Sequence, residues 1–295
     1  MPASLTREEI TTRLAAVGYI ADREIAIALQ LMDMLGRPLL LEGEAGVGKT
    51  EVAKALAAVH GTTLIRLQCY EGLDQSSALY EWNYQAQLLA IRAREGQAAG
   101  PVASERDIFS ERFLLERPLL AAIRRQDRPV LLIDEVDRAD EEFEAFLLEL
   151  LSDFQVSIPE FGTITAASIP RVVLTSNNTR ELSDALRRRC LYHYVDFPDV
   201  SRETNIIRAR VPGISAALAV QIANMVESVR KQDLRKAPGV AETLDWAAAL
   251  VGLDVKNLHD DPQAVFDTLR CLLKTQEDKS RLPREVAERL LGKIA

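Results

Sequence analysis

The eight residues from Gly43 to Thr50, Gly-Glu-Ala-Gly-Val-Gly-Lys-Thr, constrain the fold of this chain more than any other feature. They match the pattern G-x-x-x-x-G-K-[ST] in full, directly after the apolar run Leu39–Leu41 and before a helical pattern that begins near Lys49 or Thr50. The glycines allow backbone N–H groups to turn inward around phosphate oxygens, and the positive end of the following helix points at the same place. A strand, a phosphate-binding loop and a helix are therefore predicted here.

Short apolar runs alternate with helical patterns through the first 199 residues. Strands are predicted at 39–41, 63–67, 130–133, 171–175 and 191–197. After the helix that ends near residue 60, helices are predicted at 75–95, 109–126 and 141–152, with a Gly/Ala/Pro loop at 96–101. This alternation predicts an α/β fold in which helices sandwich a mainly parallel sheet.

Strand signals stop after Pro198, and only helical patterns follow. They are predicted at 201–210, 214–231, 240–251, 262–275 and 284–294. We therefore expect an α/β domain over residues 1–199, with N-terminal helices in 1–36, and a smaller all-helical domain over 200–295.

Charge and composition narrow the classes of partner. The chain has 295 residues, 44 of them acidic and 36 basic, and a net charge of −8, which argues against a nucleic-acid partner. The three cysteines show no metal-binding spacing and read as reduced thiols. No apolar run reaches the ~20 residues of a membrane span, so we expect a cytoplasmic protein, with peripheral membrane association left open.

The motif residues divide the chemistry of a nucleoside triphosphatase among them. Lys49 is expected to reach the β- and γ-phosphates, and the Thr50 hydroxyl to hold Mg²⁺. The apolar run 130–133 ends in Asp134 and Glu135, which places Asp134 beside the Mg²⁺ and Glu135 where it can deprotonate the attacking water. No guanine-binding N-K-x-D motif is present, which favours ATP. The predicted nucleotide contacts are Gly43, Glu44, Ala45, Gly46, Val47, Gly48, Lys49, Thr50 and Glu51.

With these two motifs, known as Walker A and Walker B, the chain resembles the AAA+ ATPase superfamily. Residues 171–178, "RVVLTSNN", look like the strand that carries the γ-phosphate sensor, with Asn177 preferred over Asn178. An arginine about a dozen residues further on reaches the nucleotide of the adjacent subunit in such rings, and Arg189 aligns better than Arg188. The alternative for these arginines is a solvated basic patch.

Within this superfamily the chain resembles the MoxR family, and within that family the CoxD-type proteins. The MoxR features are "LLEGEAGVGKT", "LLIDEVDRADEEFEAFLLELLSDFQVSIPEFG" and "VVLTSNN…LRRRCLYHYVDFP", and the CoxD-like segment is 65–93, supported by 113–120 and 234–246. The resemblance, over about 17–249, implies an ATP-driven ring, often a hexamer, that remodels a client together with a von Willebrand factor A-domain partner. For CoxD relatives the client is carbon monoxide dehydrogenase, whose copper–molybdenum site they help assemble.

The same resemblance assigns further positions. Tyr19 and Ile20 stand where the superfamily cradles adenine, although ordinary packing explains them nearly as well. A hairpin is expected at 155–165, and residues around Tyr80, Trp82 and Tyr84 lie where MoxR relatives carry an insertion; either element is a candidate client contact, with local packing as the alternative for Trp82.

One position departs from the MoxR pattern. Relatives place a lid arginine, sensor 2, directly after a proline, whereas here Pro238 is followed by Gly239, so Arg235 or Lys236 becomes the candidate. Two other classes of function compete with a remodelling chaperone: a nucleic-acid-directed translocase, and a switch in which nucleotide binding matters and turnover does not.

Overall fold

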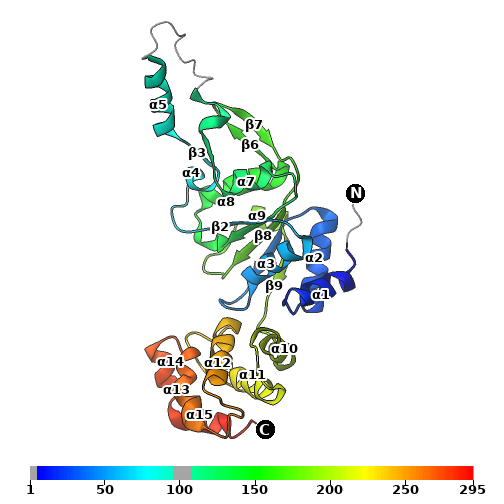
Figure 1. Ribbon diagram of the computed structural model, residues 1–295, viewed down its shortest axis with the longest axis vertical. Coiled ribbons are helices and arrows are strands. Elements are labelled where there is room, and N and C mark those ends of the chain that lie inside the picture. Colours follow the sequence, from blue (N-terminus) through cyan, green and yellow to red (C-terminus); the bar gives the residue numbers. More distant parts are fainter. Residues whose placement is uncertain (1–4, 96–107, 295) are drawn as a thin grey trace. The chain divides into compact units, whose positions relative to one another are not determined.

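The computed structural model describes residues 5–95 and 108–294, and its internal contacts divide the chain into two compact units (Figure 1). The predicted loop at 96–101 lies outside the described residues. The first unit comprises the described residues of Met1–Arg7, Glu24–Glu42 and Leu56–His193, and the second those of Glu8–Arg23, Gly43–Ala55 and Tyr194–Ala295. A boundary at residue 199 stays a prediction, because the phosphate loop belongs to the same compact unit as the C-terminal helices.

A five-stranded sheet in the order β2-β5-β8-β1-β9 forms the centre of the first unit, and it confirms the predicted α/β class. The strand pairs β2–β5, β5–β8 and β1–β8 are parallel. The five strands are β1 (Leu39–Glu42), β2 (Leu64–Gln68), β5 (Val130–Asp134), β8 (Arg171–Ser176) and β9 (Leu191–Tyr194).

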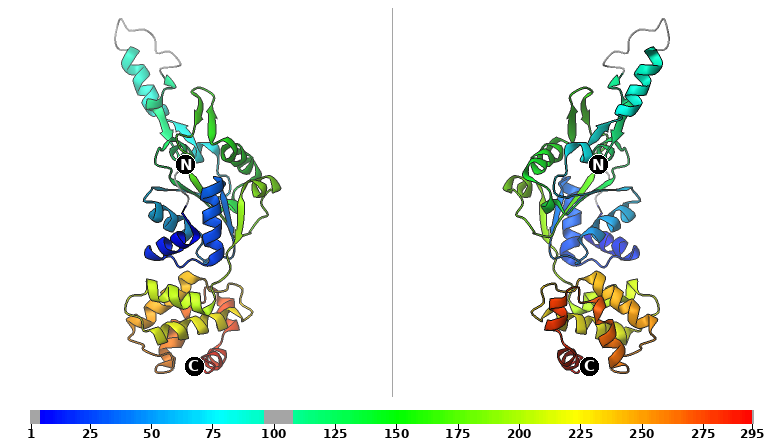
Figure 2. Two further views of the ribbon diagram at one scale, coloured as in Figure 1. Left: turned by 90° about the vertical axis from the view of Figure 1, so that its right-hand side faces the viewer. Right: turned by 90° about the vertical axis from the view of Figure 1, so that its left-hand side faces the viewer.

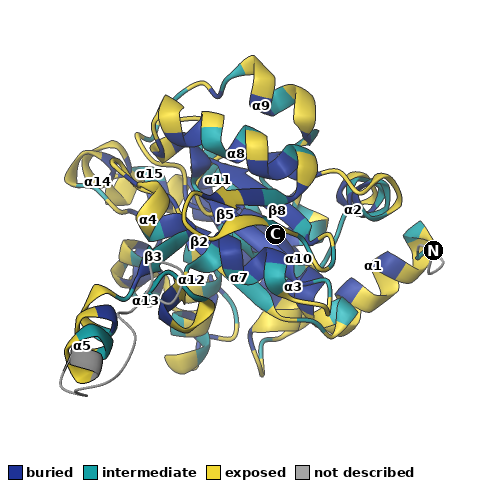
Figure 3. Ribbon diagram, turned by 90° about the horizontal axis from the view of Figure 1, so that it is seen from above, coloured by how far each residue is buried: buried dark blue, intermediate teal, exposed yellow. Residues whose placement is uncertain are grey.

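Helices cover both faces of this sheet, as Figure 3 shows for β5 and β8, which lie buried between α8 on one side and α7 on the other. Every residue of β1 and β5 is buried, which explains why both read as continuous apolar runs and not as alternating ones. The helices of the α/β region are α1 (Arg7–Ala16), α2 (Arg23–Leu35), α3 (Lys49–His60), α4 (Gln75–Ala78), α5 (Tyr84–Glu95), α7 (Pro118–Arg124), α8 (Glu141–Asp153) and α9 (Asp184–Arg189).

The prediction of two long helices, at 75–95 and 109–126, is wrong. Each is interrupted by a short strand, β3 (Tyr80–Trp82) and β4 (Leu114–Glu116), and these strands pair antiparallel with Trp82 opposite Leu114. Trp82 is buried and meets the ring of Phe109 edge-on at a centroid distance of 5.2 Å. Strand pairing across more than thirty residues of sequence therefore overrides the local helical pattern, and the contact with Phe109 supports the packing interpretation of Trp82.

The predicted hairpin at 155–165 is confirmed as β6 (Gln155–Ile158) and β7 (Gly162–Thr165), paired antiparallel. The β6–β7 hairpin and helix α5 both extend from one end of the first unit (Figure 2). Leu88 and Leu89 of α5 are 57% and 68% exposed, so this helix carries apolar side chains on an open face.

The C-terminal part is helical, as predicted, and has its own apolar core around the fully buried Trp246. The helix predicted at 262–275 is too long, because α13 ends at Thr268 and a 3-10 turn follows; the sequence reading also missed α14. None of the helices in the described part of the chain combines the length and apolarity that crossing a bilayer requires. The helices are α10 (Val200–Arg210), α11 (Ala216–Arg230), α12 (Val240–Gly252), α13 (Pro262–Thr268), α14 (Gln276–Arg281) and α15 (Arg284–Leu291).

Candidate functional site

The loop between β1 and α3 has the backbone of a phosphate cradle. Gly46 and Gly48 adopt φ values of +83° and +98°, which side-chain-bearing residues rarely reach. The ammonium group of Lys49, a buried residue, donates to the carbonyl oxygens of Gly43 at 2.6 Å and Glu44 at 2.7 Å. The cation is therefore held at the loop by the loop's own carbonyls, where a triphosphate would need a positive partner.

Tyr19 and Ile20 line a small cavity of about 70 Å³ beside this loop, together with Val47, Val240 and Leu244 among others. Its apolar side chains suit the flat face of a purine base, so the structure brings these two residues to the loop, while their contact with adenine stays a prediction. Burial raises the pKa of Tyr19 to about 12, which keeps its hydroxyl neutral.

The first turn of α12 lies directly on the phosphate loop. The backbone N–H of Val240 donates to the carbonyl of Gly46 at 2.9 Å, and a Cβ on Gly239 would come within 2.7 Å of the Gly46 Cα atom. Only glycine fits at this close approach, which explains why no arginine follows Pro238. Arg235 is 69% exposed with its guanidinium 3.8 Å from a carboxylate oxygen of Glu277, so the sensor 2 role of Arg235 or Lys236 stays a prediction.

In the first unit, Asp134 lies at the carboxyl end of β5 with both carboxylate oxygens engaged. The Thr175 hydroxyl donates to Oδ1 at 2.5 Å, and the Arg66 guanidinium donates to Oδ2 through Nε at 3.0 Å and Nη2 at 2.6 Å. Thr175 also accepts the backbone N–H of Glu135 at 2.9 Å, so one hydroxyl orients both acidic residues.

Glu135 follows with a left-handed backbone, φ +55°, and three side chains contact its carboxylate. The amide of Gln68 donates to Oε2 at 3.1 Å, Arg138 Nε lies 3.0 Å from the same oxygen, and the amide of Asn177 donates to Oε1 at 3.4 Å. The structure therefore brings Asn177, the preferred sensor candidate, next to the predicted general base.

The loop that carries Asn177 is held by Asp137, a buried residue. Asp137 accepts the backbone N–H groups of Asn177 at 3.2 Å and Thr179 at 2.9 Å, and also the Thr179 hydroxyl at 2.6 Å. Burial acts to raise the pKa of Asp137, but these hydrogen bonds outweigh it and hold the pKa below its usual value. Asn178 has φ +56° and its N–H donates to the hydroxyl of Ser176, so it serves as a turn residue.

The three arginines at the end of α9 have different surroundings. Arg187 contacts the carboxylate of Glu42 at 3.3 Å, whereas Arg188 and Arg189 are exposed. Within the described residues, neither of these two side chains has a hydrogen-bond or ion-pair partner. Arg37 contacts the backbone carbonyls of Arg188 at 2.5 Å and Arg189 at 3.2 Å, which fixes this end of the helix.

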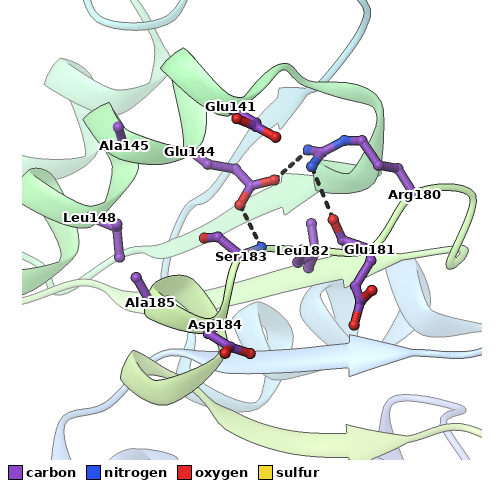
Figure 4. Close-up of a pocket in the computed structure, with 10 residues that line it drawn as sticks. All are labelled: Glu141, Glu144, Ala145, Leu148, Arg180, Glu181, Leu182, Ser183, Asp184 and Ala185. Atoms are coloured by element: carbon purple, nitrogen blue, oxygen red, sulfur yellow. Dashed lines mark hydrogen bonds and ion pairs between the residues drawn. The ribbon is translucent and has the colours of Figure 1, made fainter.

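The other end of α9 is tied to α8 by Glu144, which is 1% exposed (Figure 4). Its carboxylate accepts the Ser183 N–H at 2.9 Å and forms an ion pair with Arg180. These contacts border a pocket of about 550 Å³ whose rim includes Glu141, Glu181 and Asp184. A buried, fully engaged carboxylate therefore sets the position of the helix that presents Arg188 and Arg189.

The oxygen atoms of the predicted metal-binding residues are of the kind that bind Mg²⁺ together with a nucleotide. Among residues 5–95 and 108–294, no group of three or more His, Cys, Asp and Glu side chains could form a metal cage. Mg²⁺ in phosphoryl-transfer sites is held by one or two protein oxygens, water and the substrate phosphates. The Asp134 carboxylate and the Thr50 hydroxyl are oxygen ligands of this kind, and their joint role at a magnesium ion stays a prediction.

Reading the sequence did not identify Arg66, Gln68, Thr175 or Asp137 as site residues. Arg66 and Gln68 lie two positions apart on β2, opposite Leu132 and Asp134 of β5, so their side chains share the sheet face of Asp134. The available signal in the sequence was the presence of two polar residues, Arg66 and Gln68, near the end of the otherwise apolar strand β2. That signal indicates a site only when the neighbouring strand is known to be β5, which carries Asp134.

This combination of a parallel sheet, a glycine-rich loop opening a helix and an acidic strand end defines a P-loop nucleoside triphosphatase. Residues 38–190, more than half of the chain, match the family model described as "AAA domain (dynein-related subfamily)". The chain belongs to this family and is an ATPase.

Among curated proteins, the chain is similar to the gas vesicle ATPases of two archaea. It is 25% identical to GvpN2 of Halobacterium salinarum over 271 residues, which cover 87% of this chain and 74% of that protein. It is 27% identical to GvpN of Haloferax mediterranei over 207 residues, 67% of this chain and 58% of that one. Among solved structures, a RuvB variant of Thermotoga maritima is 19% identical with a TM-score of 0.48, over 90% of this chain and 70% of that one.

Proposed function

We propose that this chain is one subunit of a homo-oligomeric AAA+ ring, of hexameric size, that uses ATP hydrolysis with Mg²⁺ to remodel a partner protein. Membership of the AAA family supports the ring proposal, because ATPases of this family typically assemble into rings. Lys49 and the loop glycines bind the triphosphate, Thr50 and Asp134 hold Mg²⁺, Glu135 activates water and Asn177 senses the γ-phosphate.

The observation that carries the ring is the pair of exposed arginines at the end of α9. Their helix is anchored at both ends, through Arg37 and Glu144, yet the side chains of Arg188 and Arg189 contact no described residue as an ion pair. Holding two unpaired cations on a rigid, short helix suits an arginine finger that completes the site of an adjacent subunit. We assign the role to Arg189, with Arg188 as the alternative.

The test is complementation between two inactive variants. Lys49→Ala removes the phosphate partner and is expected to abolish nucleotide binding; Arg189→Ala is expected to bind ATP and lose turnover by ~10³-fold or more. In a mixed ring, a Lys49→Ala subunit still carries Arg189, and an Arg189→Ala subunit still carries an intact nucleotide site. Where two such subunits are adjacent, Arg189 of the first completes the site of the second, so ATPase activity returns in part on mixing. Arg188→Ala is the matched control, and rescue that appears only with Arg188→Ala moves the finger to that residue. Turnover that survives Arg189→Ala in isolated monomers contradicts the shared site.

The resemblance of segment 65–93 to CoxD-type proteins supports carbon monoxide dehydrogenase as the client, in the form whose copper–molybdenum site is not yet assembled. A von Willebrand factor A-domain protein would act as the adaptor. The hairpin β6–β7 and the exposed leucines of α5 are the surfaces that we assign to such partners. A gas vesicle protein is the second candidate client, because the two curated relatives are named gas vesicle ATPases.

A further inference from the structure

Arg66 neutralises the carboxylate to which we assign the metal, although no sequence motif includes it. Its Nε and Nη2 groups lie 3.0 and 2.6 Å from Oδ2 of Asp134. The two partners differ in accessibility, since the Asp134 side chain is 4% exposed and the Arg66 side chain is 51% exposed. A buried carboxylate needs a cation or donors nearby, and here the cation sits on a side chain that can withdraw into water.

The same guanidinium also contacts the residue that holds the predicted general base. Nη2 of Arg66 donates to the amide oxygen of Gln68, and the amide nitrogen of Gln68 donates to Oε2 of Glu135 at 3.1 Å. A carboxamide presents its oxygen on one side and its nitrogen on the other, so the contact with Arg66 determines which side faces Glu135. Arg66 therefore connects Asp134 to Glu135 through Gln68.

We propose that Arg66 is the resident counter-ion of Asp134, that Mg²⁺ bound with ATP has to displace it, and that its withdrawal releases Gln68. This inference rests on the proposed assignment of Mg²⁺ to Asp134. Arg66 donates twice to Oδ2 and Thr175 donates to Oδ1, so an ion that binds Oδ2 competes with Arg66 for the same lone pairs and is repelled by its charge. Loss of the Arg66 contact then frees the Gln68 amide to turn, which loosens its hold on Glu135. Arg66 is thus a positioning residue that links arrival of the metal to the group that activates water.

The test measures metal binding directly. Mn²⁺, a paramagnetic substitute for Mg²⁺, is titrated into protein present in excess over a non-hydrolysable ATP analogue, and free Mn²⁺ is followed by electron paramagnetic resonance. Arg66→Met removes the competing charge while keeping an unbranched side chain, so we expect the Mn²⁺ dissociation constant to fall roughly three- to tenfold, allowing for the solvent screening of a half-exposed guanidinium. Arg66→Lys, a point charge without the fork, should give an intermediate value.

Arg125→Met is the control for loss of an arginine charge, because Arg125 pairs with the exposed Asp127 at 2.7 and 3.0 Å on the surface of the same unit. Its Mn²⁺ affinity should equal that of the wild type. Binding of the analogue in EDTA should also be unchanged in Arg66→Met.

Two results overturn the proposal. One is equal Mn²⁺ affinity in wild type and Arg66→Met with a folded protein by thermal melting, since Arg66 would then be structural. The other is weaker metal-free analogue binding in Arg66→Met, which would make Arg66 a phosphate contact. If the wild type does not bind the ATP analogue at all, that result contradicts the proposed ATPase function and says nothing about the role of Arg66. If Arg66→Met does not fold, Arg66→Lys and Arg66→Gln carry the same comparison.

Discussion

At the scale of single residues, the backbone of Glu135 shows how this site is built. Its φ of +55° is unusual for a residue with a side chain and costs about 1–3 kcal/mol, which the surroundings have to offset. Thr175 contributes to that offset, because its buried hydroxyl accepts the Glu135 N–H at 2.9 Å while donating to Asp134 at 2.5 Å. In this conformation the Glu135 carboxylate contacts Gln68 and Asn177.

We therefore expect Thr175→Val, a change of nearly constant volume, to lower the free energy of unfolding by about 1–3 kcal/mol, because it leaves a part-buried N–H and a buried carboxylate oxygen without that partner. Turnover should fall more than nucleotide affinity, since Asp134 and Glu135 lose their alignment. Urea unfolding and steady-state ATPase kinetics measure the two effects. Thr163→Val, at an exposed position of β7, is the control; equal effects in both variants would contradict a role for the hydroxyl.

At the scale of elements, a half-buried ion cluster joins α2, α3 and β8. Asp33 of α2 lies 2.7 Å from Nε of Arg171, 3.2 Å from Nε2 of His60 and 3.5 Å from a guanidinium nitrogen of Arg128. Burial acts to raise the pKa of Asp33, but the hydrogen bond to His60 and the charge of Arg171 outweigh it and hold the pKa below its usual value of 3.8. The ionised carboxylate therefore stabilises the folded unit.

A lowered carboxyl pKa adds stability that is present above the unfolded-state value and is lost as the pH falls through the folded-state value. Asp33→Asn should thus cost roughly 2–4 kcal/mol near pH 7, because it leaves the half-buried Arg171 without its carboxylate partner, and the difference from wild type should shrink below about pH 4. Chemical unfolding across pH 3–8 gives both curves. A difference that stays constant down to pH 3 would show that the charge of Asp33 does not matter.

Sequence patterns predicted most elements of the sheet and missed the pair β3–β4. The strands β1, β5 and β8 are buried apolar runs bounded by loop signals, so local composition identifies them. Tyr80–Trp82 and Leu114–Glu116 have three residues each, and both lie within helix-like stretches. Their partner is more than thirty residues away, so only the folded chain reveals the pairing.

At the scale of the whole molecule, the expected activity depends on copies of the chain and on a client. Glu135→Gln keeps the side-chain volume but removes the basic oxygen, and its single amide oxygen can accept from Gln68 or from Asn177 but not from both. We expect it to bind ATP, to stop hydrolysis and to hold the ring together with its client. Light scattering in saturating ATP measures the ring, and a variant that stays monomeric contradicts the ring proposal.

The client is tested with purified candidates. Immobilised Glu135→Gln with ATP should retain cofactor-free carbon monoxide dehydrogenase and release it when loaded with copper and molybdenum; Lys49→Ala in the same buffer is the control. Retention of gas vesicle proteins in place of the dehydrogenase supports the second candidate. Stimulation of the ATPase by DNA would instead favour a translocase, against the net charge of −8.

Contiguous stretches of sequence determined the class of this protein. The spacing of glycines, lysine and threonine at 43–50 specifies a backbone shape and a charge within eight residues, and an apolar run ending in two acids specifies the end of a buried strand. The tertiary structure alone decided which side chains surround those acids. Arg66, Gln68 and Thr175 come from strands on either side of β5, and Glu144 holds α9 from another helix. Strand order and register arise from packing between distant segments, which local periodicity does not encode.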